Sequence, residues 1–208
     1  LRASEDALFL KIEVTMPTVY AAEGFQFIDN ATDIVGSLNA QLGSSTCAVV
    51  GALGFSDEVD PYGVTRQVLH SAASGTSSLS VALASPLATI CASFQVNVQE
   101  NVGVTLLRFM DGATAQCYLR SSLTGSIHTL NAYNGSGALL GTASVGFATG
   151  TWHQLSVKVT IHNSTGSVSI RLDGDQVLTL TNVDTQNSAT AQMTIVELAN
   201  LTNVSWWC

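Results

Sequence analysis

The amino-acid sequence predicts an all-β protein, folded as a sandwich of two antiparallel sheets. Only 11% of the 208 residues are charged while 46% are hydrophobic, so uncharged polar residues supply most of the polarity. The chain holds 23 Ser, 22 Thr and 11 Asn, a composition typical of strands joined by many tight turns. From residue 66 onward, short stretches that alternate apolar and polar residues follow one another at regular spacing. Together these observations favour a single domain with a full hydrophobic core.

The N-terminal part contains one strand signal, followed by a weakly periodic stretch. A strand is expected at residues 7–16, and we predict that it docks on the sheet edge of another chain through Leu8, Leu10, Ile12 and Val14. Residues 1–30 are then a short N-terminal extension, and residues 31–208 are the sandwich domain. Residues 20–65 are interpreted as short strands and loops, with room for a short helix at 32–42.

The strands of the domain are bounded by turn residues. They are predicted at 68–71, 79–84, 88–99, 104–110, 115–120, 126–133, 138–145, 152–161, 167–172, 176–180 and 193–198. Three hairpins are indicated by the turns Asp111-Gly112, Asn134-Gly135-Ser136-Gly137 and Asp173-Gly174-Asp175. Asp-Gly and Asn-Gly pairs adopt the positive φ angles of tight hairpin loops, so these turns locate the ends of the paired strands.

Charge and hydropathy exclude two classes of partner. The formal net charge is −8, and the seven basic residues are scattered singly along the chain. Nucleic-acid binding needs a cationic surface that displaces counterions from phosphates, and binding to anionic membranes needs a similar one. No stretch reaches the ~18 consecutive apolar residues of a membrane span. We therefore expect no nucleic-acid partner and no membrane partner.

The sequence indicates neither a cofactor nor a metal site. The cysteines form no C-x-x-C pair, and they lie far apart at Cys47, Cys91, Cys117 and Cys208. We expect free thiols packed as small apolar side chains, with a disulfide as the alternative that the sequence leaves open. The histidines are not at metal-ligand spacing; they are His70, His128, His153 and His162. Asp173 and Asp175 are interpreted as turn residues rather than as calcium ligands.

No catalytic residues are indicated either. Glycoside hydrolysis requires two neighbouring carboxylates, and the one local candidate, Glu58-Val59-Asp60, is followed by Pro61, which favours a loop. The sequence also lacks the G-x-S-x-G turn of serine hydrolases. The expectation at this point is that the protein is not an enzyme, with a jelly-roll glucanase as the weakest alternative.

One mixed polar and aromatic patch is predicted on two neighbouring strands. Alternate positions of the strands at 115–120 and 126–133 place five side chains on one face: Gln116, Tyr118, Arg120, Asn131 and Tyr133. A sugar requires an aromatic surface beside hydrogen-bonding groups, and this patch offers both. We interpret it as a glycan-binding surface or as a contact with a neighbouring subunit.

Between residues 100 and 185 a series of motifs resembles a known family. The motifs follow in the order Leu107-Arg-Phe-Met-Asp-Gly112, Tyr118-Leu-Arg120, Ala132-Tyr-Asn-Gly-Ser-Gly137, Gly150-Thr-Trp-His153, Val157-Lys-Val-Thr-Ile161 and Arg171-Leu-Asp-Gly174. This order resembles the concanavalin A-like, laminin-G-like jelly-roll domains of bacteriophage virion proteins. The resemblance implies a jelly-roll sandwich with a structural or adhesive role on a virus particle.

Three functions follow as hypotheses. The first is a virion structural protein without enzymatic activity, a head decoration, fibre or tail accessory protein on the particle exterior that contacts other virion proteins and copies of itself. The second is a lectin-like module for host glycans, and the third is a glucanase. A secreted protein remains an alternative because N-x-S/T triplets occur at Asn30, Asn134, Asn163, Asn200 and Asn203. The ends, Leu1 and Cys208, suggest a piece of a longer chain.

Overall fold

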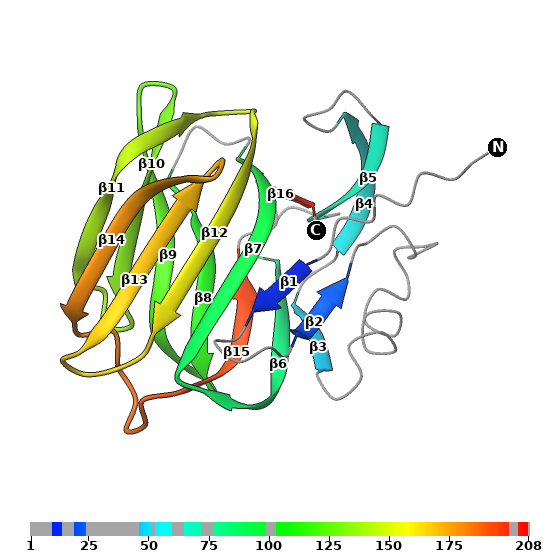
Figure 1. The fold of residues 1–208 in the computed structure, drawn as a ribbon. Helices are drawn as coiled ribbons and strands as arrows, with labels where there is room; N and C mark the ends of the chain where they lie inside the picture. Colours follow the sequence, from blue (N-terminus) through cyan, green and yellow to red (C-terminus); the bar gives the residue numbers. More distant parts are fainter. Residues whose placement is uncertain are drawn as a thin grey trace.

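A computed structural model describes residues 77–98 and 103–199 with their side chains, and the backbone of strands at 10–13, 19–23, 46–50, 53–59, 65–71 and 204–207. These residues form 16 strands, and every pairing between them is antiparallel (Figure 1). The predicted all-β jelly-roll sandwich is confirmed. In this part of the chain, no helix is long and apolar enough to cross a membrane.

The first layer is a nine-stranded sheet in the order β14-β13-β12-β7-β16-β5-β4, with β1 and β2 attached at β7. Its strands are β1 (Leu10–Glu13), β2 (Val19–Glu23), β4 (Leu53–Val59), β5 (Thr65–Ser71), β7 (Thr89–Val98), β12 (Trp152–Thr160), β13 (Gly166–Leu172), β14 (Asp175–Val183) and β16 (Val204–Trp207). This sheet faces the viewer in Figure 1.

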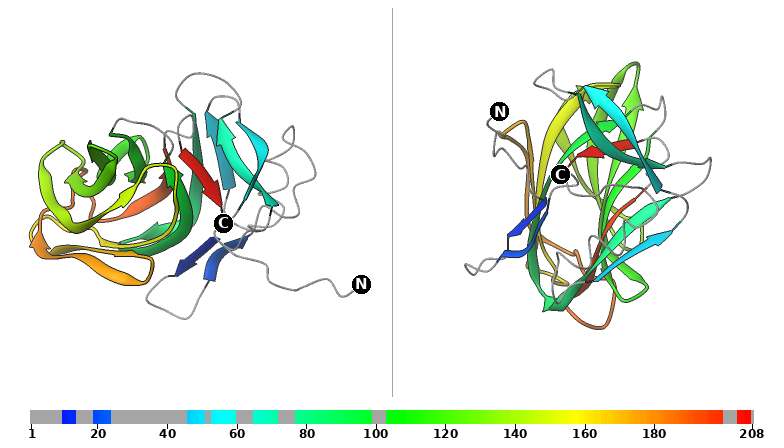
Figure 2. Two further views of the ribbon diagram at one scale, coloured as in Figure 1. Left: turned by 90° about the horizontal axis from the view of Figure 1, so that it is seen from above. Right: turned by 90° about the vertical axis from the view of Figure 1, so that its right-hand side faces the viewer.

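The second layer is a seven-stranded sheet in the order β11-β10-β9-β8-β15-β6-β3. Its strands are β3 (Thr46–Val50), β6 (Ser78–Leu87), β8 (Thr105–Asp111), β9 (Thr114–Thr124), β10 (Ile127–Asn134), β11 (Leu139–Ala148) and β15 (Met193–Leu198). Seen from above, the two sheets form separate layers, with β8–β11 behind β12–β14 (Figure 2).

The core fills the space between the two layers. On β12 the inward positions are fully buried while the residues between them are exposed or half-buried, as strand geometry requires. Leu155 is one of these buried residues of β12, and other strands contribute the large buried side chains Ile90, Phe94, Leu107, Phe109, Leu119 and Leu130. Each sheet therefore keeps its outer face for other contacts.

The hairpin turns have the backbone that their residues predict. Between β13 and β14, Asp173 and Gly174 have φ angles of 53° and 90°, which are the two left-handed positions of a tight hairpin loop. Gly112 follows β8 with a φ of 56°, and Gly137 precedes β11 with a φ of 94°. These turns join strands that pair directly, so each hairpin is a local unit of the fold.

The predicted docking strand pairs within its own chain. Lys11, Ile12 and Glu13 of β1 lie opposite β7, and β1 also pairs with β2. Leu8 and Val14 lie outside the described residues, as does the helix suggested at 32–42. Docking of this segment on another chain stays a prediction. The described part of the strand has backbone partners within its own chain on both sides, so those edges are not open to a second chain.

The expectation of a free thiol is confirmed for Cys117, one of the two cysteines whose side chains are described. Cys117 is buried in the core, and burial raises the pKa of its thiol to about 12. Cys91 is half-buried on β7. The pairing of Cys47 and Cys208 lies outside the described side chains.

Cys117 is expected to resist alkylation in the folded protein. The thiolate is the reactive form, and a raised pKa keeps the Cys117 thiol protonated at about pH 8. Iodoacetamide should therefore label Cys117 only after unfolding in guanidinium chloride, as measured by peptide mass spectrometry. Labelling of Cys117 at the same rate in native and denatured protein would contradict the burial seen here.

Candidate functional site

The outer face of the seven-stranded sheet brings the predicted site residues together. Tyr118 of β9 lies opposite Tyr133 of β10, and Arg120 lies opposite Asn131. The residues between them on these strands are buried in the core, so these side chains point to the other side of the sheet. Arg120 is exposed, the two tyrosines are half-buried, and Asn131 is buried between them. We call this outer surface of the strand pair the tyrosine face.

The two tyrosine rings stack on each other. Their centroids are 5.1 Å apart and their planes differ by 9°. Each ring shields one face of its partner, so the remaining ring faces and the outward edges with the phenolic groups are the parts that a ligand can contact. In register, Tyr118 lies beside Arg108 of β8, and Tyr133 lies beside Leu139 of β11, which is 54% exposed.

The side-chain amide of Asn131 positions two hydroxyl groups. Its Oδ1 accepts a hydrogen bond from Thr142 Oγ1 at 2.7 Å, and its Nδ2 donates to Ser122 Oγ at 2.8 Å. Thr142 and Ser122 are both exposed. Because Ser122 accepts from Asn131, its own proton is free for another acceptor, while Thr142 keeps free lone pairs. Asn131 is thus a positioning residue, and the two hydroxyls are the groups that a ligand can bind.

Gln116 does not belong to the exposed surface, and its assignment to the ligand patch is corrected. It is fully buried, because residues 184–192 cross over it between β14 and β15. Its Oε1 accepts from the backbone N–H groups of Asn187 (2.6 Å) and Ser188 (2.9 Å). Its Nε2 donates to Ser188 Oγ and to the carbonyls of Thr190 and Gln192. Gln116 therefore fastens this connection to β9.

Asp111, at the end of β8, fastens the same connection. Its carboxylate accepts hydrogen bonds from Thr190 Oγ1 at 2.5 Å and Ser188 Oγ at 2.8 Å. These bonds favour the charged form, and they hold the pKa of the Asp111 carboxyl below its usual value. Residues 184–192 are thus attached to the sheet at both Asp111 and Gln116.

The Asp111 contacts are expected to make acid stability depend on this carboxyl. A carboxyl with a pKa lower in the folded than in the unfolded state stabilises the fold fully above about pH 4, and the contribution is lost as the pH falls further. The difference in Tm between wild type and Asp111→Asn should therefore be larger near pH 7 than near pH 3. Asp175→Asn, at an exposed turn carboxyl, provides the baseline. A difference that grows on acidification would contradict this account.

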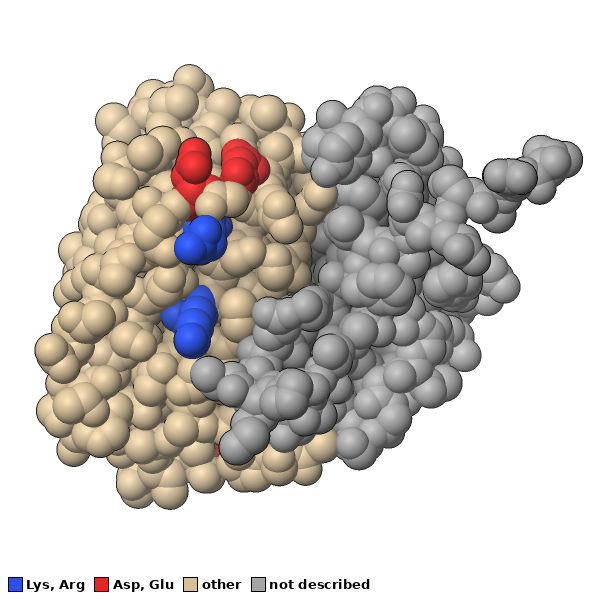
Figure 3. Space-filling model, in the orientation of Figure 1, with Lys and Arg blue, Asp and Glu red and all other residues tan. Residues whose placement is uncertain are grey.

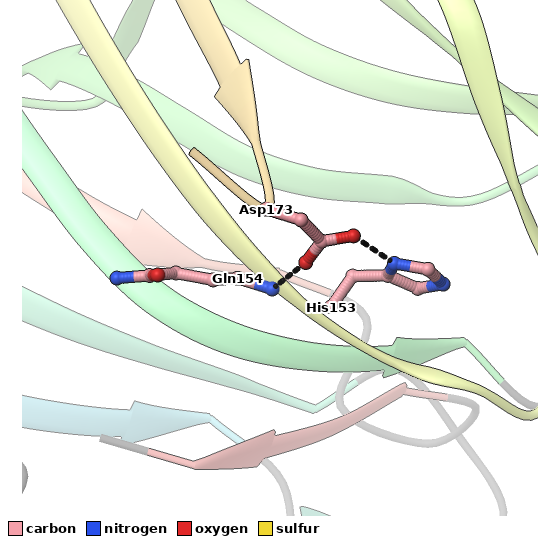
Figure 4. Close-up of polar contacts among 3 residues, drawn as sticks. All are labelled: His153, Gln154 and Asp173. Atoms are coloured by element: carbon pink, nitrogen blue, oxygen red, sulfur yellow. Dashed lines mark hydrogen bonds and ion pairs between the residues drawn. The ribbon is translucent and has the colours of Figure 1, made fainter. Parts of the chain in front are cut away.

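A second polar contact joins β12 to the β13–β14 hairpin. Figure 4 shows the Asp173 carboxylate between the His153 ring and the backbone of Gln154. Asp173 Oδ2 lies 2.7 Å from His153 Nδ1, and Asp173 Oδ1 accepts from the Gln154 N–H at 2.8 Å. His153 also contacts the Phe147 ring, and its Nε2 is buried with no hydrogen-bond partner among the residues that the structure describes.

This histidine–carboxylate pair was not predicted from the sequence. Asp173 was interpreted as a turn residue and His153 as a strand residue, and only the register that sets Leu155 opposite Leu172 reveals that the turn reaches His153. The pair fixes one imidazole nitrogen, as a second group often does for a histidine that exchanges protons. Within residues 77–98 and 103–199, no group of three or more His, Cys, Asp or Glu side chains is placed to hold a metal ion.

No protein-family model matches the sequence, and no curated protein matches it. Several solved structures share the fold. A conserved carbohydrate esterase from Shiga toxin-encoding bacteriophage phi24B matches with a TM-score of 0.54 and 16% identity, over 86% of this chain and 92% of that chain. Alginate lyase Aly36B, as a mutant in complex with alginate tetrasaccharide, matches with a TM-score of 0.50 and 11% identity, over 97% and 94%. Carbohydrate binding module CBM66 from Bacillus subtilis has a TM-score of 0.44 and 11% identity, over 77% and 90%.

These neighbours have jelly-roll, concanavalin-like folds named for carbohydrate binding or carbohydrate chemistry, and one comes from a phage. They contradict the expectation that the protein is not an enzyme, because an esterase and a lyase share its fold. The sequence was searched for only two kinds of catalytic motif, paired carboxylates and the G-x-S-x-G turn. Because one fold can carry many chemistries, the absence of these two motifs does not exclude an enzyme. The exclusion of an enzyme was therefore wrong.

Of the glucanase candidate residues, Glu58 and Val59 are described, and they lie in a strand of the other sheet from the tyrosine face. Glu58 and Val59 belong to β4, the last strand of the nine-stranded sheet, where Glu58 lies opposite Arg66. The prediction of a loop is therefore wrong for Glu58 and Val59, which lie in a strand. Asp60 and Pro61 lie outside the described residues.

Proposed function

We propose that this protein binds carbohydrate on its tyrosine face. The observation that carries the proposal is the stacked pair of Tyr118 and Tyr133, set beside the oriented hydroxyls of Ser122 and Thr142 on an outer sheet face. Sugar rings offer apolar C–H surfaces that pack on aromatic rings, and hydroxyls that need hydrogen-bond partners at the rim. The tyrosine face supplies both within one strand pair and its neighbour β11.

The comparisons support the ligand class and no more. At 16% identity or less they concern the fold, yet the phage neighbour is named a carbohydrate esterase, and the lyase neighbour holds an alginate tetrasaccharide. A carbohydrate-binding surface is therefore compatible with an isolated binding module and with an enzyme that holds a polysaccharide. The proposal concerns the binding step common to both.

A glycan array with the purified chain tests the proposal. We expect binding to a subset of glycans, with Tyr118→Ala and Tyr133→Ala each weakening it by about tenfold or more, because each removes stacked aromatic surface. Trp152→Ala is the matched control, since Trp152 is a half-buried aromatic residue on β12 of the other sheet. Unchanged Tm values or circular dichroism spectra show that the variants remain folded. A silent array, or full binding by both tyrosine variants, would refute the proposal.

A second candidate function is assembly into a phage particle. Large apolar side chains are exposed beside the tyrosine face, on β10 and β11: Ile127 (45%), Leu139 (54%) and Val145 (56%). The motif order resembles phage virion proteins, so the partners proposed are other virion proteins and copies of this chain, on the particle exterior. Mass spectrometry of purified particles should find the chain in tens of copies or more if this is its role. Its absence from the particle would rule the role out.

A further inference from the structure

We infer that the glycan bound at the tyrosine face carries a carboxylate group, and that Arg120 binds this group. The inference rests on the proposed carbohydrate binding and names the class of sugar. It starts from the distribution of charge. The chain has a net charge of −8, yet two of the four basic residues in 77–98 and 103–199, Arg108 and Arg120, lie on or beside the tyrosine face.

The two arginines differ in whether a carboxylate is paired with the guanidinium. The Arg108 guanidinium forms an ion pair with Glu197, which lies opposite it on β15. Arg120 is exposed, and its contact is a long hydrogen bond from Nη2 to the Gly103 carbonyl at 3.4 Å. Within the described side chains, no carboxylate pairs with Arg120. Its remaining N–H donors are therefore available to an anion from outside the chain.

Two acidic groups of the described residues near this face already have partners, Glu197 in the ion pair with Arg108 and Asp111 in its own hydrogen bonds. Asp111 lies at the end of β8, and its carboxylate accepts from Ser188 and Thr190. On the opposite face of the molecule, Figure 3 shows a basic side chain beside acidic ones and a further basic side chain set apart from them. Lys158 and Arg171 are the basic residues of β12 and β13 there, and Arg171 donates to the Gly174 carbonyl. Of the two arginines on or beside the tyrosine face, Arg120 is thus the one without a carboxylate partner among the described side chains.

The position of Arg120 suits a sugar acid lying along β9. Arg120 and Tyr118 are two residues apart on one face of the strand, which separates their Cα atoms by about 7 Å. An oligosaccharide that packs on the tyrosine pair can therefore reach the guanidinium with a neighbouring substituent. A planar carboxylate matches the guanidinium with two parallel hydrogen bonds, which a neutral hydroxyl cannot do. Ser122 is two residues further along β9, and Thr142 lies on β11 beyond Asn131, so their hydroxyls can bind other hydroxyl groups of the same oligosaccharide.

Titration calorimetry with acidic oligosaccharides and their methyl esters tests the inference. The probes are oligogalacturonate, alginate oligosaccharide and hyaluronan oligosaccharide, each compared with its methyl-esterified form and with neutral and sulfated oligosaccharides. We expect the wild type to bind at least one acid about tenfold or more tightly than its ester, with a preference that weakens as salt is added. Arg120→Gln should bind acid and ester equally. Arg171→Gln, an exposed arginine of the other sheet, should behave as the wild type.

The outcomes separate this inference from the proposed function. If neutral glycans or methyl esters bind as tightly as the acids, or if sulfated glycans are preferred, the carboxylate assignment fails while carbohydrate binding stands. If the Arg120→Gln variant still prefers the acid to its ester, Arg120 does not bind the carboxylate. If no glycan of any class binds, the proposed function fails and the inference fails with it.

Discussion

Replacing Gln116 with Leu is expected to lower the free energy of unfolding by about 3 kcal/mol. The change removes a fully buried amide that makes five hydrogen bonds to residues 187–192. A buried peptide group left without a partner costs about 1–3 kcal/mol, which summed over four such groups would exceed this value. The expected loss is smaller because several residues of this connection are exposed, so water reaches some of the freed groups.

Urea unfolding of the wild type, Gln116→Leu and Gln154→Leu measures this loss. Gln154 is an exposed glutamine of β12, so its replacement should change the free energy of unfolding by no more than about 0.5 kcal/mol. A Gln116→Leu protein as stable as the Gln154→Leu control would show that residues 184–192 are not held through Gln116.

Gly135→Ala is expected to be the most destabilising glycine substitution in the described hairpins. A Cβ at this position would lie 1.7 Å from the Ala115 carbonyl oxygen and 2.7 Å from Asn187 Nδ2. The turn would have to move away from β9, which breaks the hydrogen bond from the Gly135 N–H to the Gln116 carbonyl at 2.7 Å. We expect a loss of about 3 kcal/mol or more, since backbone atoms cannot move aside as a flexible side chain can.

Gly125→Ala separates this steric effect from backbone strain. Gly125 has a φ of 65°, and a Cβ there would meet nothing within 4 Å. Its replacement should cost about 1–2 kcal/mol, the penalty of the left-handed conformation alone. Denaturant unfolding of both variants gives the comparison. Equal losses would mean that the close approach of Gly135 to β9 is relaxed in solution. The Gly135 and Gln116 effects should not add, because both residues hold the start of β9.

Local patterns were sufficient to predict the strands from β6 to β15. In β12, apolar residues at every second position alternate with polar ones, and the sandwich interior then decides which face is buried. The Asp173-Gly174 pair likewise predicted the hairpin of β13 and β14, because its residue types favour the positive φ angles found there. Short strands were expected within residues 20–65, but the bounds of β3 and β4 were not predicted, and neither was β16. The partners of β3 and β16 lie far away in the sequence. β4 pairs with the next strand, β5, and it was missed because residues 20–65 alternate apolar and polar residues only weakly.

The tyrosine face could be predicted because it is a local feature. A short turn at Gly125 joins β9 to β10, so one register sets Tyr118 opposite Tyr133. The burial of Gln116 could not be predicted, because Asn187 and Ser188, which bind its side chain, lie more than 70 positions later in the chain. The contact of His153 with Asp173 has the same origin in long-range register. Burial by distant segments thus decided which predicted residues remained exposed.

The central claim is that carbohydrate lies on the tyrosine face of the seven-stranded sheet. Backbone amide chemical-shift mapping by NMR, with the glycan that binds most tightly on the array, tests it directly. The account predicts shifts concentrated in β9, β10 and β11 around Tyr118, Arg120 and Tyr133, with β12, β13 and β14 unchanged. Shifts confined to the outer face of the nine-stranded sheet would contradict it.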